Sequence, residues 1–274
     1  MRYLPREDAP ISGRIWDMID GAVVGAAKSQ LAGRRLLEIT GPYGFGYRSF
    51  DRGEQPSGVE VAFSDATAAL SSAEIQPIPM ISSGFTIPIR DVATAEEQGI
   101  RLELRSPVNA AIATAHLEDK LIFDGNKALG IPGLLNVSGA AKVKLGNWGD
   151  VGKAVDDLIA AVNALDSAGF PGPYTAALAP ALYNALFLRY PDSDLLQLEQ
   201  ARQIITGGIV KAVTLKSGGV VVTVGRYFAT IIMGQDMTVA YVGPSGTNYE
   251  FVVVESLAPR IIIPETICVL ESGK

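Results

Sequence analysis

The sequence has one histidine, His116, and one cysteine, Cys268, among its 274 residues. A single cysteine cannot build an internal disulfide framework, and the two residues together cannot supply a multi-ligand zinc-type site. One unpaired thiol is typical of a protein kept in a reducing cytoplasm. We therefore expect a cytoplasmic chain without a metal site or a cofactor of its own.

Long apolar runs and runs of positive charge are also missing. No predominantly apolar segment reaches the roughly 18 residues that a membrane-spanning helix needs, and the segment from Met1 to Asp8 is polar, unlike a signal peptide. The formal net charge is −6 and the longest run of Lys and Arg is Arg34-Arg35, which disfavours broad contact with phosphates. We expect neither a membrane nor a nucleic acid as a partner.

Apolar residues are plentiful, at 48% of the chain, and their spacing predicts both helices and strands. A repeat of three or four residues predicts amphipathic helices over Ile11–Leu37, Ser106–Asp124 and about 150–168. Ser106 is the expected N-cap of the second helix. Residues 75–89, with several prolines, are expected to be extended, and Val59–Phe63 to form a short strand.

The last hundred residues carry most of the strand signals. Beyond a strand at Tyr174–Leu178, the candidates are Val220–Val224, Tyr227–Met233, Met237–Val242, Tyr249–Glu255, Ile261–Ile263 and Ile267–Leu270. Because helices and strands do not alternate in a regular βαβ rhythm, the predicted class is α+β.

The polar residues do not form a recognisable catalytic set. His116 could act as a general base with Glu118 or Asp119, but residues one to three apart on a helix seldom form an oriented pair, so a surface or interface histidine is the simpler interpretation. Cys268 lies in an apolar strand, which favours a buried small side chain. Glu118-Asp119 is expected on a solvated helix face or where subunits meet. We therefore expect no enzymatic activity.

Two loop motifs indicate possible ligand binding, but neither is specific on its own. Gly41-x-x-Gly44-x-Gly46 has glycines that could surround a phosphate, but it follows a predicted helix and opens none, so a backbone turn is expected. Asp192 and Asp194 follow Tyr190-Pro191 on a short loop. In a symmetric oligomer such acids would repeat around an axis, and a ring of carboxylates favours cations.

Short sequence blocks spread over the chain carry the most specific signal. In order they are Ala9-Pro10-Ile11, Leu31-Ala32-Gly33-Arg34-Arg35, Gly41-Pro42-Tyr43-Gly44, Glu118-Asp119, Ile122-Phe123-Asp124-Gly125, Gly130-Ile131-Pro132-Gly133-Leu134, Gly172-Pro173-Tyr174, Tyr190-Pro191, Gly234-Gln235-Asp236-Met237 and Glu255-Ser256. No block is decisive alone. Together, their order and spacing resemble those of the encapsulin nanocompartment shell proteins, the linocin M18-like family, over essentially the full length.

The resemblance implies the HK97-type phage-capsid fold within the α+β class. The segments it implies are an N-terminal arm helix at 1–42, an extended E-loop with flanking strands at 43–90, a peripheral domain with a long spine helix at 91–134, an axial domain at 135–226, and strands returning to the peripheral domain at 227–274. It also implies self-assembly into an icosahedral cage, and the chain length suggests the smallest class, with about 60 subunits.

The resemblance further implies that the shell encloses a cargo protein, such as a ferritin-like iron oxidase used in iron storage or a peroxidase. A C-terminal targeting peptide of the cargo would dock on the inner wall. The matching positions are Arg34, Glu38, Ile39, Asp236, Met237, Thr238 and Tyr241, and the matching pore loop is Tyr190, Pro191, Asp192, Ser193 and Asp194. Arg90 stands where some members have a flavin-stacking tryptophan, so no flavin is expected there.

The sequence suggests three candidate functions. The first is a compartment shell that holds a cargo. The second is a phage or prophage major capsid protein, for which a basic interior or a scaffolding segment would be expected, and neither is evident. The third is an enzyme of the protease or bacteriocin type, which the single histidine and the apolar setting of the single cysteine disfavour.

Overall fold

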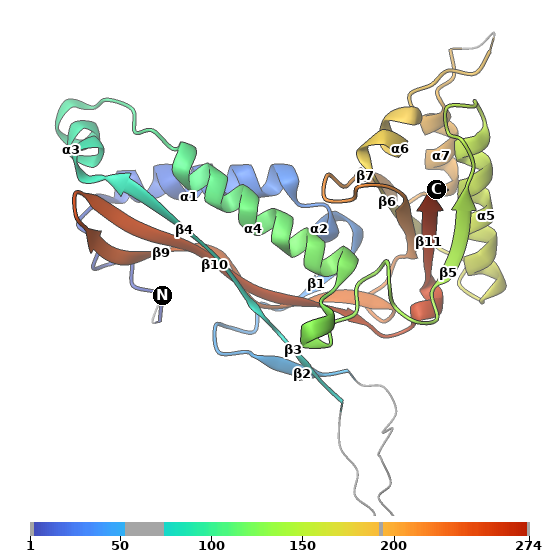
Figure 1. Cartoon of the computed structure of the whole chain (residues 1–274), viewed down its shortest axis with the longest axis horizontal. Helices are drawn as coiled ribbons and strands as arrows, with labels where there is room; N and C mark the ends of the chain where they lie inside the picture. Colours follow the sequence, from blue (N-terminus) through green and yellow to red (C-terminus); the bar gives the residue numbers. More distant parts are fainter. Residues whose placement is uncertain (1–2, 53–73, 192–193, 273–274) are drawn as a thin grey trace, which may run out of the picture.

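The computed structural model describes residues 3–52, 74–191 and 194–272. Its first sheet has the strand order β1-β9-β10-β4, formed by Glu38–Thr40, Ala229–Ser245, Asn248–Ile261 and Met80–Pro88. The long strands β9 and β10 are antiparallel and form a ribbon, with β4 antiparallel to β10 and β1 parallel to β9. This ribbon is the long axis of the molecule in Figure 1.

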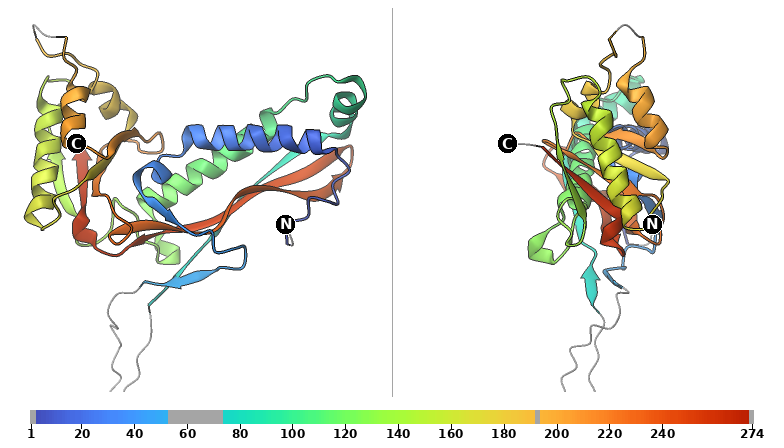
Figure 2. Two further views of the ribbon diagram at one scale, coloured as in Figure 1. Left: turned by 180° about the vertical axis from the view of Figure 1, so that it is seen from behind. Right: turned by 90° about the vertical axis from the view of Figure 1, so that its right-hand side faces the viewer.

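Two long helices cover one face of this sheet. Helix α1, Gly13–Gln30, lies beside helix α4, Arg105–Asp124, as Figure 2 shows from behind. The predicted stripe on α1 is confirmed, because Ile15, Ile19, Val23 and Ala27 are all buried. Ile15, Ile19 and Val23 pack with the inner residues of α4, β4, β9 and β10 in one core, and Ala27 packs with Leu31 and with Ala115 of α4, so these contacts fix the two helices to the sheet.

The second sheet stands at the other end of the ribbon. Its order is β5-β11-β8-β6-β7, formed by Ala141–Leu145, Ile267–Ser272, Gly219–Thr223, Tyr174–Leu178 and Gly208–Lys211. Helices α5 (Lys153–Ser167), α6 (Pro180–Ala185) and α7 (Gln197–Ile204) pack with it around a second core. We call the first sheet with helices α1 and α4 the first half of the molecule, and the second sheet with helices α5, α6 and α7 the second half. A third core, made by residues of both halves, joins the two sheets.

A small two-stranded sheet projects from the middle of the molecule. Strands β2, Ser49–Asp51, and β3, Ile75–Pro77, pair so that Phe50 lies opposite Gln76 (Figure 1). These strands lie within the segment 43–90, where an extended E-loop with flanking strands is expected; we call the pair β2–β3 the base of the projecting hairpin. The predicted strand at Val59–Phe63 lies outside the described residues.

The first predicted helix is shorter than expected and is followed by a second one. Helix α1 ends at Gln30, because Leu31 has an extended backbone, and a four-residue helix α2, Gly33–Leu36, follows. The carboxylate of Asp119 accepts hydrogen bonds from the backbone N–H groups of Ala32 and Gly33, with N···O distances of 3.0 and 2.8 Å. These bonds satisfy N–H groups that are free at the start of a helix, so they stabilise the break.

Other elements also depart from the sequence prediction. Helix α4 begins at Arg105, one residue before the expected N-cap Ser106, and no side chain caps it. Residues 89–98 form a helix, α3 (Ile89–Gln98), although Ile89 was expected to be extended. The predicted strands 227–233 and 237–242 are one strand, β9, which begins at Ala229. The predicted strand 249–255 lies within β10, whereas only Ile261 of the predicted strand 261–263 belongs to it.

The C-terminal strand β11 is the largest difference. The segment 227–274 was expected to return to the first sheet, but β11 pairs with β5 and β8 inside the second. A strand pattern shows that a segment is extended and does not show which sheet it joins, since pairing partners are distant in sequence. Short 3₁₀ turns, Lys127–Leu129 and Pro264–Thr266, complete the elements, and no described helix is long and apolar enough to cross a bilayer.

Candidate functional site

The predicted docking residues come from three elements, two of which are neighbouring strands of the first sheet. Arg34 lies on α2, Glu38 and Ile39 lie on β1, and the others lie on β9. Strand β1 runs parallel to β9 with Ile39 opposite Ile231. Glu38 is exposed and Ile39 is 43% exposed, so both are open to a partner.

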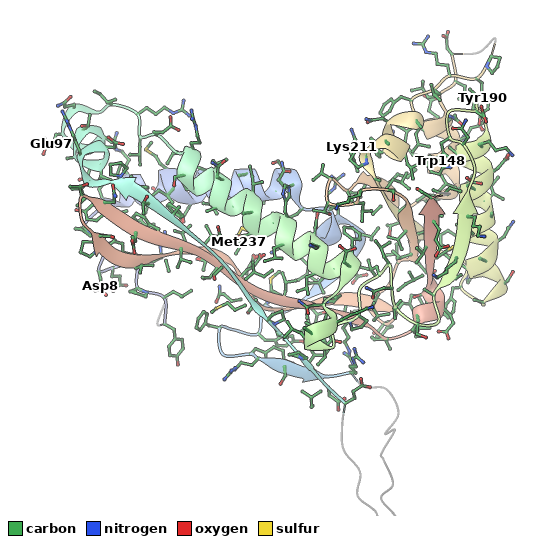
Figure 3. The ribbon with its side chains drawn as sticks, viewed as in Figure 1. Asp8, Glu97, Trp148, Tyr190, Lys211 and Met237 are labelled. Carbon is green, nitrogen blue, oxygen red and sulfur yellow. The ribbon has the colours of Figure 1, made fainter. Side chains whose placement is uncertain are left out.

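The four β9 residues do not share one surface. Asp236 is exposed, whereas Met237 is half-buried and packs with Ala27 of α1, Ala115 of α4 and Leu31, which follows α1. Figure 3 shows Met237 near the middle of α4. Thr238 and Tyr241 are each only 8% exposed. Tyr241 belongs to the core under the helices. Because side chains alternate along a strand, Thr238 lies on the other face of the sheet.

Arg34 is held by three carboxylates. Its guanidinium donates two bonds to Glu118, at 2.8 Å each, one to Glu255 at 2.9 Å and one to Asp236 at 2.7 Å. The side chains of Glu118 and Glu255 have no exposed surface, that of Arg34 is 16% exposed, and that of Asp236 is 57% exposed. This arginine therefore ties α2 to α4 and to both long strands.

The expectation that Glu118 and Asp119 lie on a solvated face is wrong. Both are fully buried: Glu118 binds Arg34, and Asp119 accepts the N–H groups at the start of α2. The signal was present in the sequence. Glu118 and Asp119 lie four and three residues before Ile122, on the same buried stripe of the helix. Acids within an apolar stripe are rarely buried without a partner, which points to an internal cation or to backbone donors.

Burial changes the proton affinity of these groups. Burial raises the pKa of Asp119 to about 6, against the lowering effect of the bound N–H groups of Gly33 and Ala32. Burial, with the neighbouring charge of Glu118, raises the pKa of Glu255 to about 9, although Arg34 acts in the opposite direction. Burial alone would lower the pKa of Arg34, but its bonds to Glu118 and Asp236 leave it raised, so the guanidinium stays charged.

The predicted pore loop lies at the far end of the second half. Figure 3 shows Tyr190 at this tip, well away from Met237. The Tyr190 hydroxyl donates to Gln200 at 2.6 Å, and its N–H donates to the carbonyl of Leu195. Asp194 is exposed and lies 3.3 Å from Arg189. Pro191 is also described, but Asp192 and Ser193 lie outside the described residues.

The residues considered for catalysis have structural contacts. His116 Nε2 lies 3.2 Å from Gln30 Oε1, which connects α4 to α1. Cys268 is buried in β11, as predicted, and burial raises its pKa to about 11, which disfavours the reactive thiolate. In the described part of the chain no group of three or more His, Cys, Asp or Glu residues has the arrangement of a metal site. The turn Gly41–Gly46 opens no helix, although it follows strand β1 and not a helix as expected.

The architecture has clear relatives among solved structures. A virus-like particle protein from Pyrococcus furiosus is similar with a TM-score of 0.74 and 22% identity, over 94% of this chain and 99% of that one. The capsid of Myoviridae phage XM1 is similar with a TM-score of 0.59 and 14% identity, over 86% and 90%. The helix pair on a long ribbon, the small two-stranded sheet and the second sheet therefore define the HK97-type capsid fold.

The family within this class follows from the sequence comparison. The model of the Linocin_M18 family, described as "Encapsulating protein for peroxidase", matches residues 1–258. The chain belongs to this family, the encapsulin shell proteins. The type 1 encapsulin shell protein EncA of Myxococcus xanthus is 33% identical over 99% of this chain and 97% of its own length.

Two other relatives are fusions. A diheme-cytochrome-encapsulin shell fusion protein of Kuenenia stuttgartiensis is 30% identical over 93% of this chain and 72% of its own length. A ferritin-like-encapsulin shell fusion protein of Pyrococcus furiosus is 27% identical over 77% and 57%. Their names place a shell part and a second functional part in one polypeptide.

Proposed function

We propose that this protein is the shell subunit of an encapsulin nanocompartment and that its copies close into an icosahedral cage of about 60 subunits. The observation that carries the proposal is the family match over residues 1–258 on a capsid-type fold. The alternative of a phage capsid protein shares the fold, but the family match favours the compartment.

The proposed role is structural and does not include catalysis. Two observations support this. His116, the only histidine in the sequence, forms a hydrogen bond with Gln30, and Cys268, the only cysteine, is buried, which raises its pKa and favours the protonated thiol. The proposed location of the assembled shell is the cytoplasm. Its support is the free thiol of Cys268, because a reducing compartment keeps cysteines unpaired.

The proposed cargo is a ferritin-like iron oxidase or a peroxidase, attached through a C-terminal targeting peptide. The support comes from the family description and from the ferritin-like fusion among the relatives. A ferritin-like cargo would make the compartment an iron store. Many copies of one weak peptide site on the wall give sufficient avidity for capture.

The docking surface we propose is smaller than the full set of matched positions. Ile39 offers exposed apolar area on β1, Met237 is half-buried on β9, and Glu38 and Asp236 supply exposed charge. The Arg34 guanidinium is already bonded to carboxylates of this chain and is not free to bind a peptide directly. It contributes to the surface by holding Asp236 in place, at 2.7 Å. Thr238 and Tyr241 support the surface from within the sheet.

The pore loop remains part of the proposal. Tyr190, Pro191 and Asp194 lie between α6 and α7 at the tip of the second half, where a symmetric assembly would bring copies of the loop around one axis. Asp194 is fully exposed and its pairing with Arg189 is between two exposed side chains, so both charges remain available to passing ions.

The test is electron microscopy of the purified protein, with mass spectrometry of every protein that co-purifies. We expect uniform hollow particles and a co-purifying enzyme whose C-terminal peptide is needed for capture. A small discrete oligomer without particles would contradict the shell role.

The docking surface is tested in the same preparation by Ile39→Asp. We expect this variant to form particles but to retain at least tenfold less cargo, since a charge replaces apolar contact area. The matched control is Ile159→Asp, which changes a similarly exposed residue, 41% against 43%, on helix α5. Equal cargo in both variants would reject the proposed surface while leaving the shell role intact.

A further inference from the structure

The charges around Arg34 do not balance. The groups that face one another are Arg34 of α2, Glu118 and Asp119 of α4, Asp236 of β9 and Glu255 of β10. Arg34 is the one cation among these described residues, against four carboxyl groups. An unpaired charge in the interior is costly, because burial removes it from water.

The negative charges of two of the four carboxyl groups are stabilised by groups other than Arg34. Asp236 is 57% exposed, so water solvates its charge. Asp119 accepts the backbone N–H groups of Ala32 and Gly33. Glu118 and Glu255, with no exposed side-chain surface, are left to share a single guanidinium.

The hydrogen bonds show where a proton is missing. Glu118 uses both of its oxygens on Arg34, and Glu255 accepts from Arg34 through Oε2. The other oxygen, Glu255 Oε1, is buried and meets no donor in the described chain. A proton on this pair would convert an unsatisfied acceptor into a donor between the two carboxyl groups and would remove one buried charge.

We propose that Glu118 and Glu255 share one proton at neutral pH, and that this protonated pair with Arg34 is a latch that holds helices α1 and α2 on α4 and the ribbon. The connection is physical: Arg34 lies on the short helix that directly follows α1, Glu118 is on α4, and Glu255 is on β10. Loss of the proton leaves two buried anions facing one cation, and the latch weakens.

The direction of the pH dependence follows from the carboxyl pKa values. The pKa of Glu255 rises from the ordinary 4.5 to about 9 in the folded chain, chiefly through burial. The folded state therefore keeps a proton that the released state gives up. The latch is fully stable below about 4.5 and weakens as pH rises towards about 9, and Asp119 contributes with the same sign between 3.8 and about 6.

The test is hydrogen exchange of the backbone amides of Ala32 and Gly33 in the purified protein from about pH 7 to about pH 10, above the titration of Asp119 and corrected for intrinsic exchange. For one released proton, the opening equilibrium is expected to increase by up to about tenfold per pH unit below the folded pKa. Glu255→Gln donates a permanent N–H to Glu118 and cannot titrate, so its profile is expected to be flat. The same slope in Glu255→Gln as in the wild type would overturn the proposal.

The control is Glu271→Gln. Glu271 pairs with Lys142 at the surface of the second sheet, so this variant removes one carboxylate and keeps the wild-type slope. A second measurement needs no variant: the wild-type protein at pH 7 is expected to show an infrared carbonyl band of a protonated carboxyl that disappears above about pH 10. Absence of that band at pH 7 would overturn the proposal even if Glu255→Gln did not fold.

Discussion

Gly125 and Gly133 lie against each other where the chain turns back at the end of α4. A Cβ on Gly133 would come within 2.3 Å of the Gly125 backbone nitrogen, and a Cβ on Gly125 would come within 2.3 Å of the Ile131 carbonyl oxygen. This contact lets the N–H groups of Leu134 and Leu135 reach carbonyls of the last turn of the helix. The end of α4 is thus satisfied by backbone that only glycines allow to approach.

We expect Gly133→Ala to destabilise the protein by about 3 kcal/mol, because the clashing atoms belong to the backbone and cannot rotate away. The melting temperature of the purified protein should fall by roughly 5–10 °C. Gly130→Ala is the matched control in the same turn, since its Cβ meets nothing within 4 Å and its positive φ alone costs about 1 kcal/mol. Equal melting temperatures for the two variants would contradict the argument.

At this scale the sequence predicted single-residue environments unevenly. Cys268 and the stripe of α1 were predicted from their apolar neighbours, because burial follows directly from hydrophobic periodicity. Glu118 and Asp119 were not, since an acid is normally exposed and its burial depends on a cation and on N–H donors more than 80 residues away in the chain. The docking set was known only from resemblance, and no local pattern shows that Arg34 is already occupied.

At the scale of elements, the base of the projecting hairpin is fixed by one arginine. Arg52 bonds to Glu74 and to Gln76 across the two strands, and reaches the carbonyl of Gly130 after α4 at 3.1 Å. Its own carbonyl accepts from Arg260 of β10. The orientation of β2 and β3 on the subunit is therefore set by contacts to the end of α4 and to the ribbon.

We expect Arg52→Gln to lower the yield of closed particles several-fold while the subunit still folds, because the hairpin base loses its ion pair and its bond to Gly130. The measurement is the ratio of particles to smaller species by size-exclusion chromatography and electron microscopy. Arg48→Gln is the control, a nearby exposed arginine with no ion pair within the described residues. An unchanged ratio for Arg52→Gln would show that the clamp does not guide assembly.

The elements themselves were predicted better than their lengths and partners. The strand Tyr174–Leu178 matches its prediction residue for residue, and α4 starts one residue earlier than expected. The interruption after α1 and the fusion of two predicted strands into β9 were missed, because both depend on contacts made elsewhere. Asp119 holds the start of α2, and β10 pairs along β9 through register shifts that a single strand cannot reveal.

For the whole molecule, the proposed pore makes a prediction about transport. In an assembled shell loaded with an iron-oxidising cargo, Asp194→Asn is expected to slow initial iron uptake about two- to fivefold, because each loop loses one exposed carboxylate and keeps Arg189. Glu265→Gln, in the turn before β11, removes a charge away from this loop and serves as the control. Equal uptake by wild type and Asp194→Asn would reject a role for this loop in cation entry.

The placement of β11 has a consequence for how a subunit is made. The second sheet needs strands β5 to β8, which are synthesised before the β9–β10 ribbon of the first sheet, and β11, which is translated only after that ribbon. The second half therefore cannot be finished until every strand of the first half has been translated. A chain still on the ribosome lacks a complete second half, which keeps it from joining a growing shell.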